Sequence, residues 1–201
     1  MIDTYKTIAF ASPEILFKEK NSKFFGYAFP ISSEEEVKTH LDVLKKKHPG
    51  AGHFCYAFQL GTDSKQFRAN DDGEPSNTAG MPIYGQIQSF DVTNILVVVV
   101  RIFGGVKLGV GGLISAYRTG AQMALEASDI IEKTIDIHYI ISFDYKNMNK
   151  VMRVIKEKNL NIVSQKMENS CQIEIATRKK NAENIFEIFT NLFEIDIKLK
   201  E

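Results

Sequence analysis

The segment from Val97 to Arg118, VVVVRIFGGVKLGVGGLISAYR, constrains the fold of this chain more than any other. Its apolar run predicts a buried strand, and Leu113 and Tyr117 begin a pattern with helical spacing. Five glycines lie within nine positions between the two elements, at Gly104, Gly105, Gly109, Gly111 and Gly112. Glycines before a helix permit positive φ and expose backbone N–H groups at the positive end of the helix dipole. The segment therefore predicts a strand-to-helix junction that is able to accept an anion.

The glycine segment matches neither of the two common nucleotide-binding motifs. A Walker loop counted from Gly104 reaches Gly109, but Val110 stands where the motif requires lysine. The dinucleotide fingerprint fails because Ile114 stands where its last glycine is required. Two interpretations stay open: a backbone anion site, and a corner in which glycines only permit tight packing. The cations expected to serve an anion site are Lys107, Arg101 and Arg118.

A second notable segment is RANDDGEPSNTAGMP, residues 68–82. Asp71, Asp72 and Glu74 place three carboxylates close to Arg68. Such carboxylates could hold Mg²⁺, cap the N–H groups of a following turn, or pair with Arg68. We expect capping or pairing and no metal, because no second acidic cluster completes an octahedral site.

Two smaller features have alternative interpretations. His53 and Cys55 share one face of a predicted strand, which makes a nucleophile pair conceivable. No third group that would orient the pair is identifiable, so we predict no catalytic residues. The lysines of residues 45–47 close a predicted helix, where they form either a solvated helix end or a patch that contacts phosphate.

Composition limits the possible partners and location. The 201 residues contain 25 basic and 25 acidic side chains, so contact with nucleic acid requires a local basic patch. Cys55 and Cys171 fit no metal or redox spacing, which is typical of a reducing cytosol. The first residues, MIDTYKTIAF, do not resemble a signal peptide, and the aliphatic run 95–100 is too short to span a membrane. We therefore expect a soluble cytoplasmic protein.

The order of predicted elements indicates an α+β fold in two domains. Three short strands, a helix opened by Ser33 and Glu36 in a capping-box pattern, and a strand at HFCYAFQL precede the glycine segment. A polar loop and a short helix near residues 83–88 come between that strand and the buried one. From Ile135 onward the pattern reads βαββαβ, with a hairpin turn at Glu168-Asn169, which is typical of a ferredoxin-like unit. We place the domain boundary after residue 132, which gives an N-terminal domain of residues 1–132 and a C-terminal domain of residues 133–201.

Two long motifs carry a resemblance to a known family. At DDGEPSNTAGMP and TNILVVVVRIFGGVKLGVGGLISAY the sequence resembles the IMPACT family, in its bacterial YigZ branch. The resemblance extends to NSKFFGYAFPISSEEEV, KKKHPGAGHFCYAF and the C-terminal unit. The chain departs from the family pattern at Asn70, Asn77, Ile102 and Ser115. Ser115 replaces a frequent arginine, for which Arg118 could substitute one turn later.

The resemblance implies a fold and a function. It implies an N-terminal domain like those of a ribosomal small-subunit protein, elongation factor G domain IV and small-molecule kinases, and a C-terminal domain like elongation factor G domain V. Eukaryotic members regulate translation by competing for an activator of a kinase that acts on an initiation factor. We therefore expect a non-enzymatic regulator, without a cofactor, that binds RNA, the ribosome or a translation factor. The alternative is a phosphate-handling enzyme related by fold to the kinases. The family-motif residues expected at the site are Arg68, Asp71, Asp72, Glu74, Thr78, Gly80 and His53.

Overall fold

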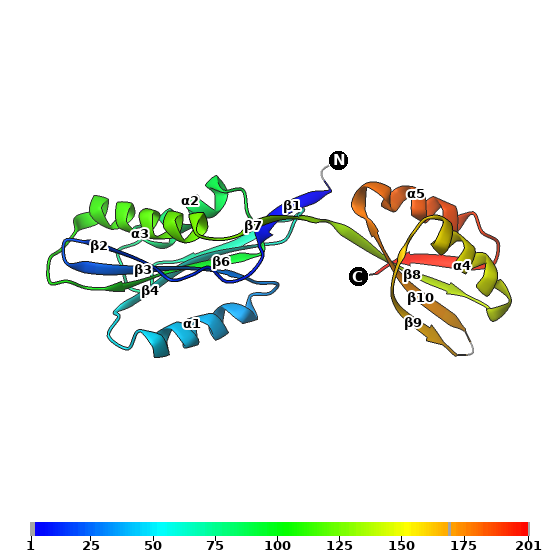
Figure 1. Ribbon diagram of the computed structural model, residues 1–201, viewed down its shortest axis with the longest axis horizontal. Coiled ribbons are helices and arrows are strands. Elements are labelled where there is room, and N and C mark those ends of the chain that lie inside the picture. Colours follow the sequence, from blue (N-terminus) through cyan, green and yellow to red (C-terminus); the bar gives the residue numbers. More distant parts are fainter. Residues whose placement is uncertain (1–2, 169, 201) are drawn as a thin grey trace. The chain divides into compact units, whose positions relative to one another are not determined.

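The computed structural model describes residues 3–168 and 170–200, and it forms two compact units. The first unit is Tyr5–Lys133, and the second begins at Thr134 and includes Asp3 and Thr4. Helices and strands are mixed in both units, which confirms the α+β class (Figure 1). The elements up to the boundary are β1 (Thr4–Ile8), β2 (Ile15–Glu19), β3 (Ser22–Pro30), α1 (Glu35–Lys47), β4 (His53–Leu60), β5 (Gln66–Asn70), α2 (Gly80–Ser89), β6 (Ile95–Ile102), α3 (Gly109–Glu126) and β7 (Ile130–Thr134).

The first unit is built on an antiparallel five-stranded sheet with the order β2-β3-β6-β4-β5. Helices α2 and α3 cover one face of this sheet and α1 covers the other (Figure 1). Each face has its own hydrophobic core, with Val97 and Val99 of β6 in one and Val98 and Val100 in the other. The central strand β6 is therefore buried on both faces, which explains its uninterrupted apolar sequence.

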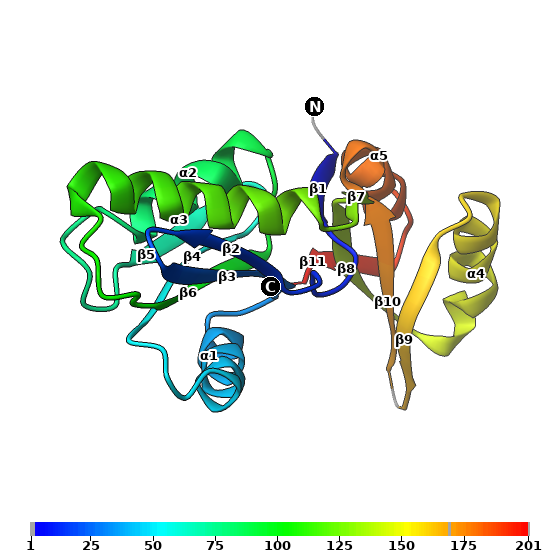
Figure 2. The ribbon, with the colours of Figure 1, turned by 60° about the vertical axis from the view of Figure 1, so that its left-hand side comes forward.

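Helix α3 lies unusually close to the sheet. Figure 2 shows it running along the strands of the first unit. A Cβ built on Gly26 of β3 would lie 2.5 Å from the carbonyl oxygen of Gly120 in α3. The small residues Ala116, Gly120 and Ala124 are buried on the same helix face. This seam of small residues lets the helix backbone approach the strand backbone.

The second unit has the predicted βαββαβ order. Its elements are β8 (Asp136–Phe143), the short 3-10 turn η1 (Tyr145–Asn147), α4 (Met148–Glu157), β9 (Asn161–Met167), β10 (Cys171–Arg178), α5 (Lys179–Thr190) and β11 (Ile195–Leu199). The antiparallel sheet has the order β11-β8-β10-β9, and its core includes Ile141, Ile173 and Phe189. The predicted hairpin is the β9–β10 pair, and Asn169 of its turn lies outside the described residues.

Two strands were not predicted. The sequence of β5, QFRAN, lies inside the segment that we expected to be a polar loop, and its pairing with β4 defines it as an edge strand. Strand β7 pairs with β1, which is distant in sequence. Both strands are exposed for most of their length, so neither has the alternating apolar pattern that indicates a strand.

The start of α1 differs in part from the predicted capping box. The Oε1 atom of Glu36 accepts hydrogen bonds from the N–H groups of Ser32 and Ser33, at 2.9 and 3.2 Å. The helix begins at Glu35, and its N-cap residue Glu34 makes no side-chain capping bond. The glutamate half of the box is therefore present and the serine half is absent.

Among the described residues, no helix is both long and apolar enough to cross a membrane.

Candidate functional site

The acidic loop, the glycine segment, His53 and Arg101 meet at one end of the sheet of the first unit, whereas Arg68 and Arg118 lie farther from it. His53 at the start of β4 lies directly opposite Arg101 near the end of β6. The loop that follows β5 carries the acidic residues and leads into α2, and the glycine segment follows β6 and leads into α3. Both helices therefore begin at the same sheet end, beside the same set of polar side chains.

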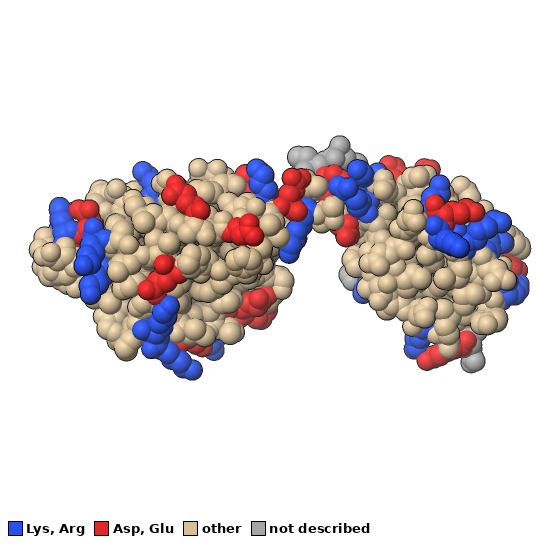
Figure 3. Space-filling model, viewed as in Figure 1, with Lys and Arg blue, Asp and Glu red and all other residues tan. Residues whose placement is uncertain are grey.

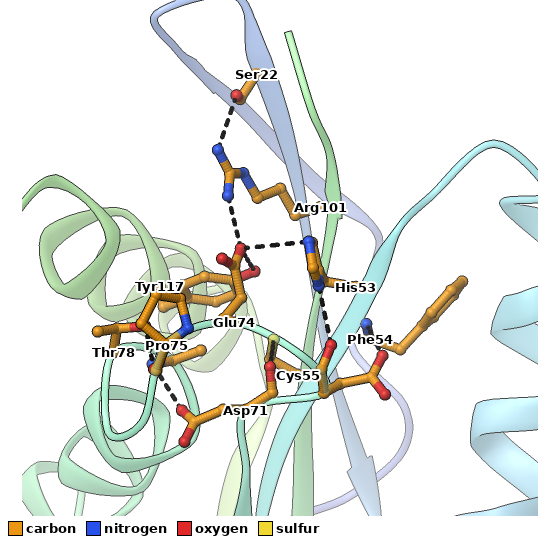
Figure 4. Close-up of polar contacts among 12 residues, drawn as sticks. Ser22, His53, Phe54, Cys55, Asp71, Glu74, Pro75, Thr78, Arg101 and Tyr117 are labelled. Atoms are coloured by element: carbon orange, nitrogen blue, oxygen red, sulfur yellow. Dashed lines mark hydrogen bonds and ion pairs between the residues drawn. The ribbon is translucent and has the colours of Figure 1, made fainter. Parts of the chain in front are cut away.

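The centre of this sheet end is a buried polar cluster of Glu74, Arg101, Tyr117 and His53 (Figure 4). The Oε1 atom of Glu74 accepts hydrogen bonds from Nη1 of Arg101 and from the hydroxyl of Tyr117, both at 2.7 Å. The side chains of Glu74 and Arg101 are only 5% and 6% exposed. Arg101 also reaches the hydroxyl of Ser22 at 3.4 Å, while its Nε has no hydrogen-bond partner among the described residues. Burial raises the pKa of the Tyr117 hydroxyl, so it stays protonated and donates.

His53 lies at the edge of this cluster. Its Nδ1 lies 2.9 Å from the carbonyl oxygen of Asp72, which can only accept, so Nδ1 carries the proton. The other ring nitrogen, Nε2, then faces Oε1 of Glu74 at 4.0 Å.

Cys55 does not form a nucleophile pair with His53. Its thiol donates to the carbonyl oxygen of Asp71 at 3.0 Å, and the residue is fully buried. Burial raises the pKa of the thiol, so the reactive thiolate is disfavoured at neutral pH.

The other two carboxylates of the acidic loop hold the protein backbone. Oδ1 of Asp71 accepts hydrogen bonds from the N–H groups of Ala79 and Gly80 at the start of α2, and Oδ2 accepts from Asn77. Asp72 accepts from the N–H of Phe54 at 2.6 Å. Capping is therefore what the structure shows for Asp71, as expected.

The remaining residues of the acidic loop also have structural contacts. Arg68 pairs with Glu34 at 2.7 Å rather than with the loop carboxylates. The Thr78 hydroxyl donates to the carbonyl of Pro75, and a Cβ on Gly80 would collide with the backbone of Asn70. Asn77, which stands where the family usually has glycine, has φ of 62°, a conformation that asparagine tolerates better than most side chains. The departure at this position is therefore compatible with the turn.

The glycine segment is partly a packing corner and partly open. Gly105 and Gly109 have φ of 86° and 76°, which favours glycine at both positions. A Cβ on Gly104 would overlap the backbone of Asn21 and Ser22. At Gly111, by contrast, a Cβ would have no neighbour within 4 Å. The local backbone therefore favours glycine at positions 104, 105 and 109, whereas it does not at Gly111.

The predicted cations divide into two kinds. Lys107 and Arg118 are exposed, and no ion pair involves either of them among the described residues. Arg101 is buried and paired with Glu74, so it is not a surface cation. Sequence reasoning missed Tyr117 and Ser22 as members of the cluster. Tyr117 carried only a core signal, because its ring packs in the hydrophobic core while its hydroxyl reaches Glu74.

This arrangement can fix the acidic loop rigidly, but it offers no evident metal centre. Among the described residues, no group of three or more histidine, cysteine, aspartate or glutamate side chains is placed to hold an ion. The acidic loop is joined to the sheet by the Glu74–Arg101 pair and the Cys55 thiol bond, to α2 by the Asp71 carboxylate, and to α3 by the Tyr117 hydroxyl. The open chemistry of this end lies instead at the start of α3.

The chain is similar to several known proteins along most of its length. Residues 20–125 match the family model described as the Impact N-terminal domain. "IMPACT family member YvyE" of Bacillus subtilis is 30% identical over 100% of this chain and 92% of that protein. An "IMPACT family member" of Haemophilus influenzae is 33% identical over 84% of each chain, and "IMPACT family member YigZ" of Escherichia coli is 32% identical over 77% of each.

A solved structure is similar over both units. A "Crystal structure of an hypothetical protein" matches with a TM-score of 0.77 and 25% identity, over 100% of this chain and 99% of that one. The family model lies within the unit Tyr5–Lys133 that carries the buried polar cluster. The chain belongs to the IMPACT family and is similar to its bacterial members YigZ and YvyE.

Proposed function

We propose that this chain is a cytoplasmic, non-enzymatic regulator associated with translation, which binds RNA, the ribosome or a translation factor. In this proposal the phosphates of the partner lie against the backbone N–H groups at the start of α3. Lys107 and Arg118 supply the charge. Membership of the IMPACT family supports the association with translation, because the resemblance identifies its eukaryotic members as translation regulators.

The observation that carries the proposal is the open start of α3. Its N-cap residue Leu108 makes no side-chain capping bond, and its first turn contains no acidic residue. Gly111 leaves the surface over this turn uncovered. An anion at this point would satisfy free N–H groups and interact favourably with the helix dipole. Arg118 lies three residues after Ser115, so the two exposed positions share one helix face.

The expected likeness to elongation factor G domains IV and V stays a prediction, and it agrees with a partner from the translation machinery.

The alternative, a phosphate-handling enzyme, needs carboxylates that are free to hold Mg²⁺. Asp71 and Asp72 are engaged by backbone N–H groups, and Glu74 is engaged by Arg101 and Tyr117. These contacts favour the binding protein over the enzyme.

The proposal is tested by titrating a fluorescein-labelled single-stranded RNA with the chain, followed by fluorescence anisotropy at about 50 and about 200 mM salt. Lys107→Ala and Arg118→Ala should each weaken binding and reduce the log–log salt slope by about 0.7, the value for one phosphate contact to a single strand. The matched controls are Lys156→Ala and Arg153→Ala, exposed cations of α4 in the other unit. Unchanged affinity and slope in both test variants would mean that the glycine segment binds no phosphate and serves only to permit tight packing.

A further inference from the structure

Five exposed lysines lie on two neighbouring elements of the first unit. Three belong to the β2–β3 hairpin and two to the last turn of α1. They are Lys18, Lys20, Lys23, Lys45 and Lys46, which we call the lysine surface.

The register of the hairpin directs two of these side chains away from α3. Lys18 lies directly opposite Lys23 on neighbouring strands, so both side chains are on one face of the sheet. The next residue, Phe24, is buried in the core under α3, with its ring 5.4 Å from that of Tyr117. Successive strand residues point to opposite faces, and therefore Lys18 and Lys23 face the side of the sheet that carries α1.

The end of α1 is anchored next to them. Lys47 pairs with Glu14 at 2.7 Å, and its ammonium lies 5.2 Å from the centre of the Tyr27 ring. The ring of His48 lies 4.4 Å from that of Phe25. Phe25 follows Lys23 by two residues on the same sheet face, so the last turn of α1 is adjacent to the paired lysines.

The lysine surface carries an excess of positive charge. Across the described parts of the chain, no ion pair involves any of its five members. Of the nearby acids, Glu14 is paired with Lys47, and Glu19 follows Lys18 and therefore points to the opposite face. Asp42 on α1 is the remaining exposed acid of this helix half. Figure 3 shows basic side chains grouped at the hairpin end of this unit and again at the end of α1.

Folding alone does not favour this arrangement. Like charges directly opposite on neighbouring strands repel each other. Lys20 has φ of 44°, a backbone conformation that glycine or asparagine adopts at lower cost. A bound polyanion would relieve the repulsion, because it neutralises the paired ammonium groups.

We propose that the lysine surface is a second contact for the phosphates of single-stranded RNA, on the opposite side of the sheet from the start of α3. Lysines are depleted in protein–protein interfaces, whereas they are the usual partners of nucleic-acid phosphates. The hairpin connects the two surfaces, because the N–H of Gly104 donates to the hydroxyl of Ser22 at 3.2 Å. One strand of RNA can therefore contact the glycine segment, cross the hairpin and reach α1. The inference rests on the proposed function for the class of partner, but concerns different residues.

The experiment compares two double variants of the full chain, Lys18→Ala/Lys23→Ala and Lys45→Ala/Lys46→Ala, with labelled single-stranded RNA. Each should weaken binding and reduce the log–log salt slope by about 1.4, two contacts of about 0.7 each. The control Lys156→Ala/Lys158→Ala removes the same charge from exposed positions of the second unit and should leave the slope unchanged. Loss of the repelling pair should also leave the Tm of Lys18→Ala/Lys23→Ala equal to or above that of the original chain.

The possible failures can be distinguished. If both double variants bind RNA as the original chain does, while Lys107→Ala binds more weakly, the lysine surface is overturned and the proposed function stands. If the original chain binds no RNA at either salt concentration, both are overturned. If labelled polyglutamate binds and RNA does not, with the same two variants weakened, the surface accepts an acidic protein and the RNA assignment is wrong.

Discussion

Replacement of Glu74 by glutamine tests the buried polar cluster. The carboxylate receives hydrogen bonds from Arg101 and Tyr117 at 2.7 Å, and its side chain is 5% exposed. Glutamine keeps the volume and one acceptor oxygen but removes the charge that balances the guanidinium. Removing one partner of a buried ion pair typically destabilises a protein by about 3 kcal/mol or more, because the other charge stays buried without compensation. We expect the free energy of unfolding to fall by about 3 kcal/mol.

The assay is urea unfolding, followed by circular dichroism, of Glu74→Gln, Arg101→Met and the double variant. The double variant should be less destabilised than the sum of the two single changes, because it contains no unpaired buried charge. Tyr117→Phe removes one hydrogen bond and should cost about 1 kcal/mol. A loss below about 1 kcal/mol for Glu74→Gln would mean that water reaches the pair, and it would refute the reasoning from burial.

Three further predictions concern the glycine segment and pH. Gly104→Ala should destabilise the chain by about 2 kcal/mol through collision with the backbone of Asn21, and a Tm equal to that of the original chain would contradict this. Burial lowers the pKa of His48, so its contribution to stability is present above its unfolded pKa of about 6.5 and is lost as pH falls through the folded value. In His48→Gln the free energy of unfolding should therefore depend less on pH across this window. The hydrogen bond from Lys200 is the largest cause that lowers the pKa of Glu174 to about 2, so its stabilisation is present above an unfolded pKa of about 4.3 and is lost as pH falls toward 2. Glu174→Gln should remove this acid dependence, and an unchanged acid transition would exclude the role of Glu174.

Much of the fold was predictable because its signals are local. The apolar run of β6 is buried on both faces, and the helical stripe of α3 includes the small residues that pack on β3. The βαββαβ order of the second unit follows from clear alternation between strand and helix periods. Strands β5 and β7 could not be predicted, because their own sequences are mostly exposed and carry no strand pattern. They are defined by their pairing, β5 with β4 and β7 with β1.

The candidate site was predictable in its position and only partly in its contacts. Residue type predicted that carboxylates of the acidic loop cap N–H groups or pair with Arg68. That Asp71 is the one that accepts from Ala79 and Gly80, eight and nine residues later, was not predicted. The pairing of Glu74 with Arg101 could not be predicted, because the two are 27 residues apart and meet only when the acidic loop folds over the end of β6. Arg101 was therefore expected as a surface cation, although the sheet buries it. Of the lysine surface, only the α1 part was anticipated, because phosphate contact was one interpretation of the lysines at residues 45–47. The hairpin part could not be predicted, since the hairpin and the end of α1 become neighbours only through the register of β2 and β3.

The central claim, that this chain works with the translation machinery through RNA contacts, is tested most directly by capture from a native lysate. The tagged chain and its Lys107→Ala/Arg118→Ala variant would each be recovered with and without ribonuclease, and the bound RNA sequenced. The account predicts that the original chain recovers ribosomal or messenger RNA with translation components, and that ribonuclease or the double substitution reduces this recovery. Recovery of neither RNA nor translation components by the original chain, with or without ribonuclease, would contradict it.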